Sequence, residues 1–138
     1  MKHSAIGFLA LALMAAAPLS APLWAHHSFA AEYDSNKPLN LKGAVTKIEW
    51  QNPHVYFYID VKDDTGKVVN WAFEMGAPAV IQRNGWTRNS MKIGDLVIVE
   101  GSQAKSGKPH GNARSVTMAS TGKKLGAGSS EGQTYQEQ

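Results

Sequence analysis

Hydrophobic and polar side chains alternate in the middle of the chain, which is typical of β-strands with one buried face. The alternation is cleanest over residues 54–61 and recurs over residues 68–75. The apolar residues that would share the buried face are Val55, Phe57, Ile59, Val61, Val69, Trp71, Phe73 and Met75. Between the two runs, Asp63-Asp64-Thr65-Gly66 is typical of a tight turn, so the two segments are predicted to form a hairpin.

Three more strands are predicted from the same kind of pattern. In residues 39–50 the apolar residues first occupy odd-numbered positions and then even-numbered ones. This shift by one position indicates a β-bulge or sharp bend near Gly43 to Lys47. Short runs rich in branched side chains predict two further strands, over residues 96–100 and 112–118.

A short helix is predicted between the third and fourth strands, over residues 77–84, because Pro78 stands near its start and Gly85 just past its end. The order β-β-β-α-β-β predicts a mainly β fold, a small five-stranded OB-like, partly open barrel. Closing the strands into a barrel would cover the edge strands and give the apolar faces a common interior. An open five-stranded sheet with one helix is the alternative.

The two ends of the chain differ in composition from this middle. Residues 1–25 begin with Lys2, continue with an apolar run over 6–17 and close with Ala25, which is typical of a cleavable secretory signal peptide. We therefore expect a periplasmic protein released by cleavage near Ala25. The remaining divisions that we predict are an N-terminal extension over 26–38, the OB-like domain over 39–119, and a disordered tail over 120–138 that is rich in Gly, Ser, Gln and Lys.

Composition excludes several classes of function. The chain has no cysteine, so we expect neither disulfides nor a lipidated cysteine that would anchor the cleaved protein to a membrane. Its formal net charge of +3 is too small and too dispersed for nucleic-acid binding. The sequence carries no nucleophile elbow, phosphate-binding loop or dinucleotide fingerprint, so a non-enzymatic function is favoured.

Four histidines are the candidate metal ligands: His26, His27, His54 and His110. On the OB-like layout His54 and His110 fall in the two loops that flank the ligand face of this fold, so they could converge. Cleavage after Ala25 would give His26 a free amino group beside its imidazole. This chelating pair suits Cu(II) and, less well, Zn(II) or Ni(II), and it resembles the histidine brace of lytic polysaccharide monooxygenases. The alternative is that all four are turn, loop or chain-end residues without a metal.

Tyr56, Tyr58 and Glu74 form a second candidate site, on the outward face of the predicted hairpin. Two tyrosines two positions apart on a strand make an aromatic platform of the kind that OB-folds use for stacking. A periplasmic protein, peptide or glycan is the partner that we would expect there. The alternative is that the tyrosines serve strand formation and are covered by the helix or by the N-terminal segment.

Several motifs resemble those of a known family. They are His26-His27-Ser28-Phe29, Gly43-x-Val45-x-x-Ile48-x-Trp50-x-Asn52-Pro53-His54, Trp71-x-x-Glu74 and Gly94-Asp95-x-Val97. From His26 to about Leu125 the chain resembles a family of small exported Gram-negative proteins catalogued as a domain of unknown function. The resemblance implies a periplasmic location and a compact β domain, and it assigns no catalytic residues.

Three functions agree with these residues. The first is a soluble periplasmic protein that binds a ligand or partner, with copper as a candidate ligand of the histidines. The second is a copper-dependent redox enzyme or metal chaperone that uses the amino terminus of His26. The third is a structural accessory subunit that presents the face of Tyr56 and Tyr58 to a partner.

Overall fold

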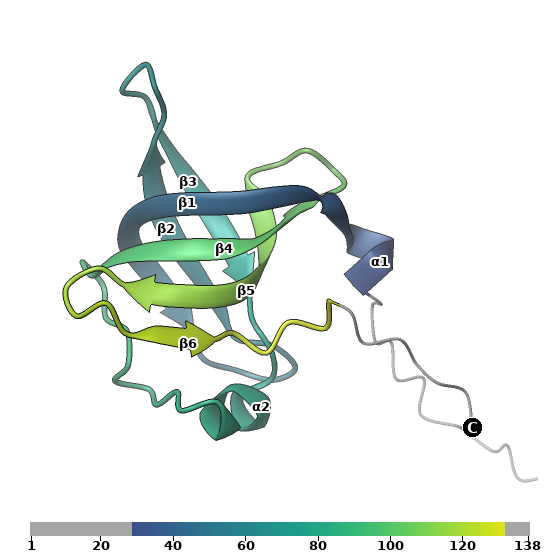
Figure 1. Ribbon diagram of the computed structural model, residues 1–138, viewed down its shortest axis with the longest axis vertical. Helices are drawn as coiled ribbons and strands as arrows, with labels where there is room; N and C mark the ends of the chain where they lie inside the picture. Colours follow the sequence, from purple (N-terminus) through teal and green to yellow (C-terminus); the bar gives the residue numbers. More distant parts are fainter. Residues whose placement is uncertain (1–28, 132–138) are drawn as a thin grey trace, which may run out of the picture.

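The computed structural model describes residues 29–131 and shows a mainly β fold (Figure 1). The predicted signal peptide, His26, His27 and the last seven residues of the predicted tail lie outside this range. In chain order the elements are α1 (Phe29–Glu32), β1 (Tyr33–Glu49), β2 (Tyr56–Lys62), β3 (Val68–Glu74), α2 (Pro78–Arg83), β4 (Leu96–Ala104), β5 (His110–Met118) and β6 (Lys124–Gly126). The predicted hairpin corresponds to β2 and β3, and the predicted helix to α2.

The six strands form one sheet in the order β3-β2-β1-β4-β5-β6, with antiparallel neighbours throughout. A further, parallel pairing of β3 with β5 joins the sheet to itself, so that β1 to β5 form a ring of five strands. In this pairing Ala72 lies opposite His110, and Glu74 lies opposite Asn112. The closure therefore brings the start of β5 beside the end of β3.

Strand β1 serves two neighbours because it is long and bent. Its first part pairs with β4 and its last part pairs with β2, and the register shifts between Val45 and Lys47. The irregularity predicted near Gly43 to Lys47 is therefore confirmed. A side chain at Gly43 would collide with the main-chain carbonyl of Asp60 on β2, which explains the need for glycine where the strand turns from one neighbour to the other.

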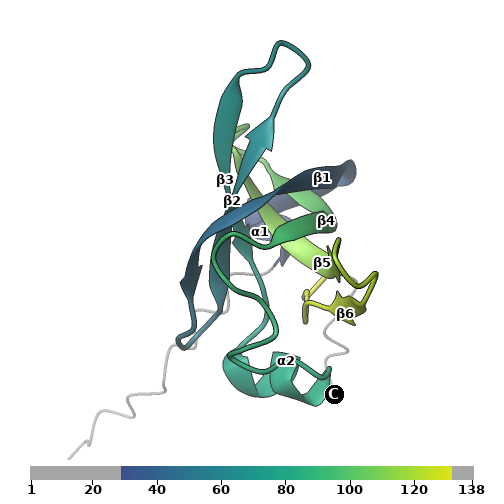
Figure 2. The same cartoon turned by 90° about the vertical axis from the view of Figure 1, so that its left-hand side faces the viewer.

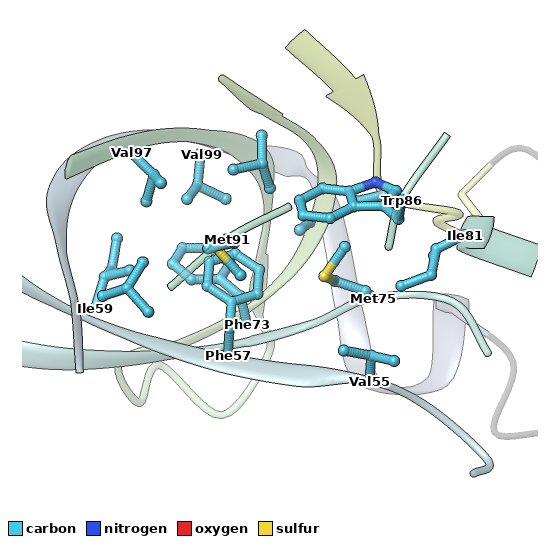
Figure 3. Close-up of a cluster of buried hydrophobic side chains, with 14 of the residues drawn as sticks. Val55, Phe57, Ile59, Phe73, Met75, Ile81, Trp86, Met91, Val97 and Val99 are labelled. Atoms are coloured by element: carbon cyan, nitrogen blue, oxygen red, sulfur yellow. The ribbon is translucent and has the colours of Figure 1, made fainter. Parts of the chain in front are cut away.

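The apolar core fills the inside of the ring (Figure 3). Phe57 and Phe73 stack with their ring centroids 5.5 Å apart, and Val97 and Val99 face them from β4. At the end near α2, Trp86 closes the core, and its indole nitrogen donates a hydrogen bond to the carbonyl of Gly126 at 2.8 Å. Figure 2 shows α2 at this end of the molecule, opposite the projecting turn between β2 and β3.

Two boundaries differ from the expected ones. Strand β1 begins at Tyr33, inside the segment that was predicted as an extension over residues 26–38. Beyond residue 120, where disorder was predicted, β6 pairs with β5 and Ala127 is completely buried. Both segments lack a clear apolar alternation, and they are held by main-chain pairing and by a few side chains. Hydrophobic periodicity does not detect such attachments.

Candidate functional site

The carboxylate of Glu74 is the centre of a polar cluster on the outside of the ring. It lies at the end of β3, is 8% exposed, and accepts hydrogen bonds from the hydroxyls of Tyr33 at 2.8 Å and Tyr56 at 2.6 Å on the same oxygen, Oε2. Its other oxygen lies 3.0 Å from Nδ1 of His54. A carboxylate with three donors at hydrogen-bonding distance is strongly anchored, so its position is fixed by the fold.

His110 extends this cluster toward the N-terminal end of the described chain. Its Nε2 is 3.1 Å from the hydroxyl of Tyr33, and the two rings meet edge to face with centroids 5.4 Å apart. Its Nδ1 lies 3.7 Å from a carboxylate oxygen of Glu32, the last residue of α1. We call the six residues together the Glu74 cluster: Glu32, Tyr33, His54, Tyr56, Glu74 and His110.

Strand register explains why these residues meet. Tyr56 and Glu74 are direct partners across β2 and β3, so their side chains lie side by side on one face. The parallel pairing of β3 with β5 brings His110 to the same face, opposite Ala72. Strand β1 starts here too, because Tyr33 pairs with Ala104 at the end of β4. Segments distant in sequence thus converge where the ring closes.

The two phenols bound to Glu74 keep their protons to unusually high pH. Burial raises the pKa of Tyr33 far above its ordinary value, and the negative charge of Glu74 and the hydrogen bond to it raise it further. Burial also raises the pKa of Tyr56, followed by the same two effects of Glu74. Both hydroxyls therefore act as hydrogen-bond donors to this carboxylate throughout the physiological range.

An alkaline titration tests this arrangement. Because the pKa of Tyr33 is higher in the folded protein than in the unfolded chain, its contribution to stability is complete below the unfolded value of about 10 and is lost as the pH rises above it. We expect the free energy of unfolding, measured by urea denaturation, to fall with pH above about 10. The fall should be shallower in Tyr33→Phe, and an unchanged slope in that variant would contradict the assignment.

Tyr58 does not belong to the cluster, although it shares the outward face of β2 with Tyr56. Its hydroxyl donates to Glu49 at 2.8 Å, and the ammonium of Lys47 lies 5.0 Å from the centre of its ring. Of the predicted ligand face, the structure thus brings Tyr56 and Glu74 together and directs the hydroxyl of Tyr58 to a different carboxylate. The separate pairing makes Tyr58 a matched control for the cluster.

The predicted metal ligands are placed unequally. His54 and His110 both belong to the Glu74 cluster, but they contact different atoms. Nδ1 of His54 lies at Oε1 of Glu74, whereas His110 contacts the hydroxyl of Tyr33, which donates to Oε2. Within residues 29–131, no three His, Asp or Glu side chains are grouped so that they could hold a metal ion. His26 and His27 lie outside the described residues.

Glu32 and Tyr33 are the cluster residues that sequence reasoning missed. They lie in the segment predicted as an extension, whose pattern shows no strand periodicity. The signal that could have found them is their proximity in sequence to His26 and His27: an aromatic and an acidic side chain follow the histidine pair within a few residues.

A small apolar pocket lies elsewhere in the fold. It is lined by Ile48, Trp50, Val55, Met75, Trp86, Thr87, Arg88 and Met91. The guanidinium of Arg88 lies 5.6 Å from the centre of a Trp50 ring and partly covers this side of the tryptophan. The pocket shares no residue with the Glu74 cluster, and its surface is almost entirely apolar, so it offers few groups that could orient a polar ligand.

Comparison with known proteins shows which family the chain belongs to. The model of a family described as "Family of unknown function (DUF6152)" matches residues 13–114. The chain belongs to this family. The predicted resemblance to a domain of unknown function is therefore confirmed, and the match to DUF6152 covers every residue of the Glu74 cluster as well as His26 and His27. No curated protein matches the sequence. In the described part of the chain, no helix has the length and apolar character needed to cross a membrane.

Proposed function

We propose that this protein is an exported, non-enzymatic binding protein that holds a divalent metal ion, preferably Cu(II). The proposed site is the part of the Glu74 cluster formed by Glu32 and His110. The observation that carries the proposal is the approach of Glu32 to His110, where a carboxylate oxygen lies 3.7 Å from Nδ1. This oxygen and this nitrogen belong to residues far apart in sequence, and the entry of the chain into the fold brings them together.

The two groups have the chemistry of metal ligands. With metal bonds of about 2.0–2.2 Å, an imidazole nitrogen and a carboxylate oxygen on one ion are at most about 4 Å apart, so the observed 3.7 Å lies within this limit. Both side chains are open to solvent, with 26% of His110 and 41% of Glu32 exposed. They supply a partial site that needs further ligands.

His26 and His27 are the residues proposed to complete it. His27 precedes Phe29, the first residue of α1, by two positions in the sequence. The ring of Phe29 is 5.5 Å from the ring of Tyr33, which in turn contacts His110. This proximity in sequence to Phe29 is the ground for proposing that the histidine pair joins Glu32 and His110.

Export supplies the remaining donor in this proposal. Residues 1–25 act as a signal peptide, and cleavage after Ala25 gives His26 a free amino group in the periplasm. An amino nitrogen and an imidazole on the same residue form a chelating pair, which binds Cu(II) more tightly than the other first-row divalent metals. Without cleavage at this position the amino nitrogen is part of a peptide bond.

The fold supports a binding role at this place. We propose that the ring of five strands is an OB-like barrel, since β3 pairs in parallel with β5 and α2 lies between β3 and β4. In OB-folds the loops between the first two and the last two strands border the ligand face. His54 lies in the loop between β1 and β2, and His110 directly follows the loop between β4 and β5.

Native mass spectrometry of the processed protein tests the proposal. We expect an amino terminus at His26, one Cu(II) per chain, and a dissociation constant below micromolar. His110→Ala should weaken copper binding at least tenfold, because it removes a ligand. Tyr58→Phe serves as the control, because its hydroxyl binds Glu49 outside the Glu74 cluster, and it should bind copper with nearly unchanged affinity.

Three outcomes would overturn the metal proposal: a different amino terminus, the absence of stoichiometric copper at micromolar concentration, or equal affinities in wild type and His110→Ala. If the copper-bound protein also catalyses the oxidation of a reductant by oxygen, its function is that of a copper-dependent redox enzyme and not that of a binding protein. Capture of a periplasmic protein, peptide or glycan that depends on Tyr56 and Tyr58, without copper, would instead support the accessory function.

A further inference from the structure

We propose that Tyr33 and Glu74 form a hydrogen-bond relay that fixes the tautomer of His110, so that Nε2 carries the proton and Nδ1 is presented as the metal ligand. The relay makes Tyr33 and Glu74 positioning residues of the site. Its part in metal binding rests on the proposed function, whereas its effect on the tautomer is a property of the metal-free protein.

The direction of the relay follows from counting protons. A carboxylate can only accept, and Oε2 of Glu74 accepts from the hydroxyls of both Tyr33 and Tyr56. A phenol has a single proton, so the hydroxyl that donates to Glu74 can interact with His110 only as an acceptor. The 3.1 Å contact between this oxygen and Nε2 of His110 is then an N–H donating to oxygen.

The second nitrogen of His110 is therefore the one with the free lone pair. A neutral imidazole carries one proton, and with that proton on Nε2 the lone pair of Nδ1 points to the side where Glu32 lies, 3.7 Å away. A cation between them would accept electron pairs from both. This is the usual arrangement of metal-binding histidines, in which the nitrogen that does not bind the metal donates to a polar partner.

Burial gives the relay its rigidity. Tyr33 is 3% exposed, which limits the access of water to its hydrogen bond with Glu74. The main chain of His110 is held as well, because residue 110 pairs with Ala72 in the sheet. On the far side of the carboxylate, His54 interacts with Oε1 and leaves Oε2 to the two phenols. The parts of the relay are thus fixed by the closure of the ring and do not depend on a ligand.

The variant Tyr33→Phe tests the relay by removing a single oxygen atom. In metal-free wild type at about pH 8, ¹⁵N NMR should show His110 protonated at Nε2 and unprotonated at Nδ1. In Tyr33→Phe we expect a mixture of both tautomers and a copper affinity that is about 10- to 100-fold lower, the usual effect of losing such a partner. The His110 signals are assigned by their absence in His110→Ala.

Tyr58→Phe is the matched control, because it removes a hydroxyl from the neighbouring position on β2 that is bound to Glu49 instead. It should change neither the tautomer of His110 nor the copper affinity. If Tyr33→Phe fails to fold, as judged by circular dichroism, Glu74→Gln provides the second test, since an amide can donate to the Tyr33 oxygen and so reverse the relay.

The possible results separate this inference from the proposed function. Wild-type protein that binds no copper refutes the proposed function, while the tautomer measured without metal still decides the relay. Wild type with His110 protonated at Nδ1, or Tyr33→Phe with an unchanged tautomer and unchanged affinity, overturns the relay even where copper binds. A changed melting temperature alone supports neither, because a purely structural hydroxyl would also change it; the tautomer decides in that case.

Discussion

Replacing Phe73 by alanine is expected to lower the free energy of unfolding by about 3–5 kcal/mol. The side chain is completely buried, stacks on Phe57 at 5.5 Å and lies 6.1 Å from a Trp71 ring. The strands around it are joined in a ring, so they can move little toward the space that a benzyl group leaves. Urea denaturation followed by tryptophan fluorescence measures the loss.

Val68→Ala provides the comparison on the same strand. Val68 is 51% exposed at the start of β3, and truncation there should change the free energy of unfolding by less than about 0.5 kcal/mol. A loss below about 1 kcal/mol for Phe73→Ala would mean that the ring of strands collapses around the cavity or that the core is packed differently.

The interior of the ring could be predicted because its strands obey a simple periodicity. Val55, Phe57, Ile59 and Phe73 alternate with polar residues, and all four are fully buried. The bulge in β1 was visible as a slip in parity, because each residue in a strand faces opposite to the one before it. Local pattern identified the inward face of the hairpin, although Val61, Val69 and Trp71 on the same face are only half-buried.

The Glu74 cluster could be predicted only in part, because it depends on which strands become neighbours. His54, Tyr56, Glu74 and His110 were candidates by residue type. The position of Tyr33 follows from the pairing of the start of β1 with the end of β4, a contact between residues about 70 positions apart. Its segment has no apolar alternation, and its side chain is buried by contact with polar groups, so no hydrophobic pattern marks it.

Strand pairing also explains why the two tyrosines of β2 bind different carboxylates. Their spacing places Tyr56 and Tyr58 on one face, as predicted, but cross-strand neighbours determine what each hydroxyl meets. On β3, Tyr56 lies opposite Glu74 and Tyr58 opposite Ala72, so only Tyr56 meets a carboxylate there. The hydroxyl of Tyr58 instead reaches Glu49 on β1, a diagonal neighbour. These cross-strand neighbours depend on the register of the strands, which the sequence pattern alone does not determine.

Replacing Glu74 by alanine is expected to destabilise the metal-free protein by about 2–4 kcal/mol, in the presence of a chelator. The change leaves three donors without their acceptor, namely the hydroxyls of Tyr33 and Tyr56 and Nδ1 of His54. A buried donor without a partner costs about 1–3 kcal/mol, and Tyr33 is the member that water reaches least. Tyr56 and His54 are more exposed and should contribute less, because water can replace the carboxylate there.

Glu49→Ala is the control for Glu74→Ala. It removes a more exposed carboxylate, which accepts a hydrogen bond from Tyr58 and pairs with Lys47. It should cost much less than Glu74→Ala, because surface ion pairs contribute little. The double variant Glu74→Ala with Tyr33→Phe shows how much of the loss comes from the Tyr33 hydroxyl left without its acceptor. If this hydroxyl is the main cause, the double variant should be destabilised by less than the sum of the two single variants.

Equal losses for Glu74→Ala and Glu49→Ala, or strict additivity in the double variant, would show that the carboxylate of Glu74 does not organise the cluster through Tyr33. The relay to His110 would then lose its physical basis, since it requires the same hydrogen bond that this comparison measures.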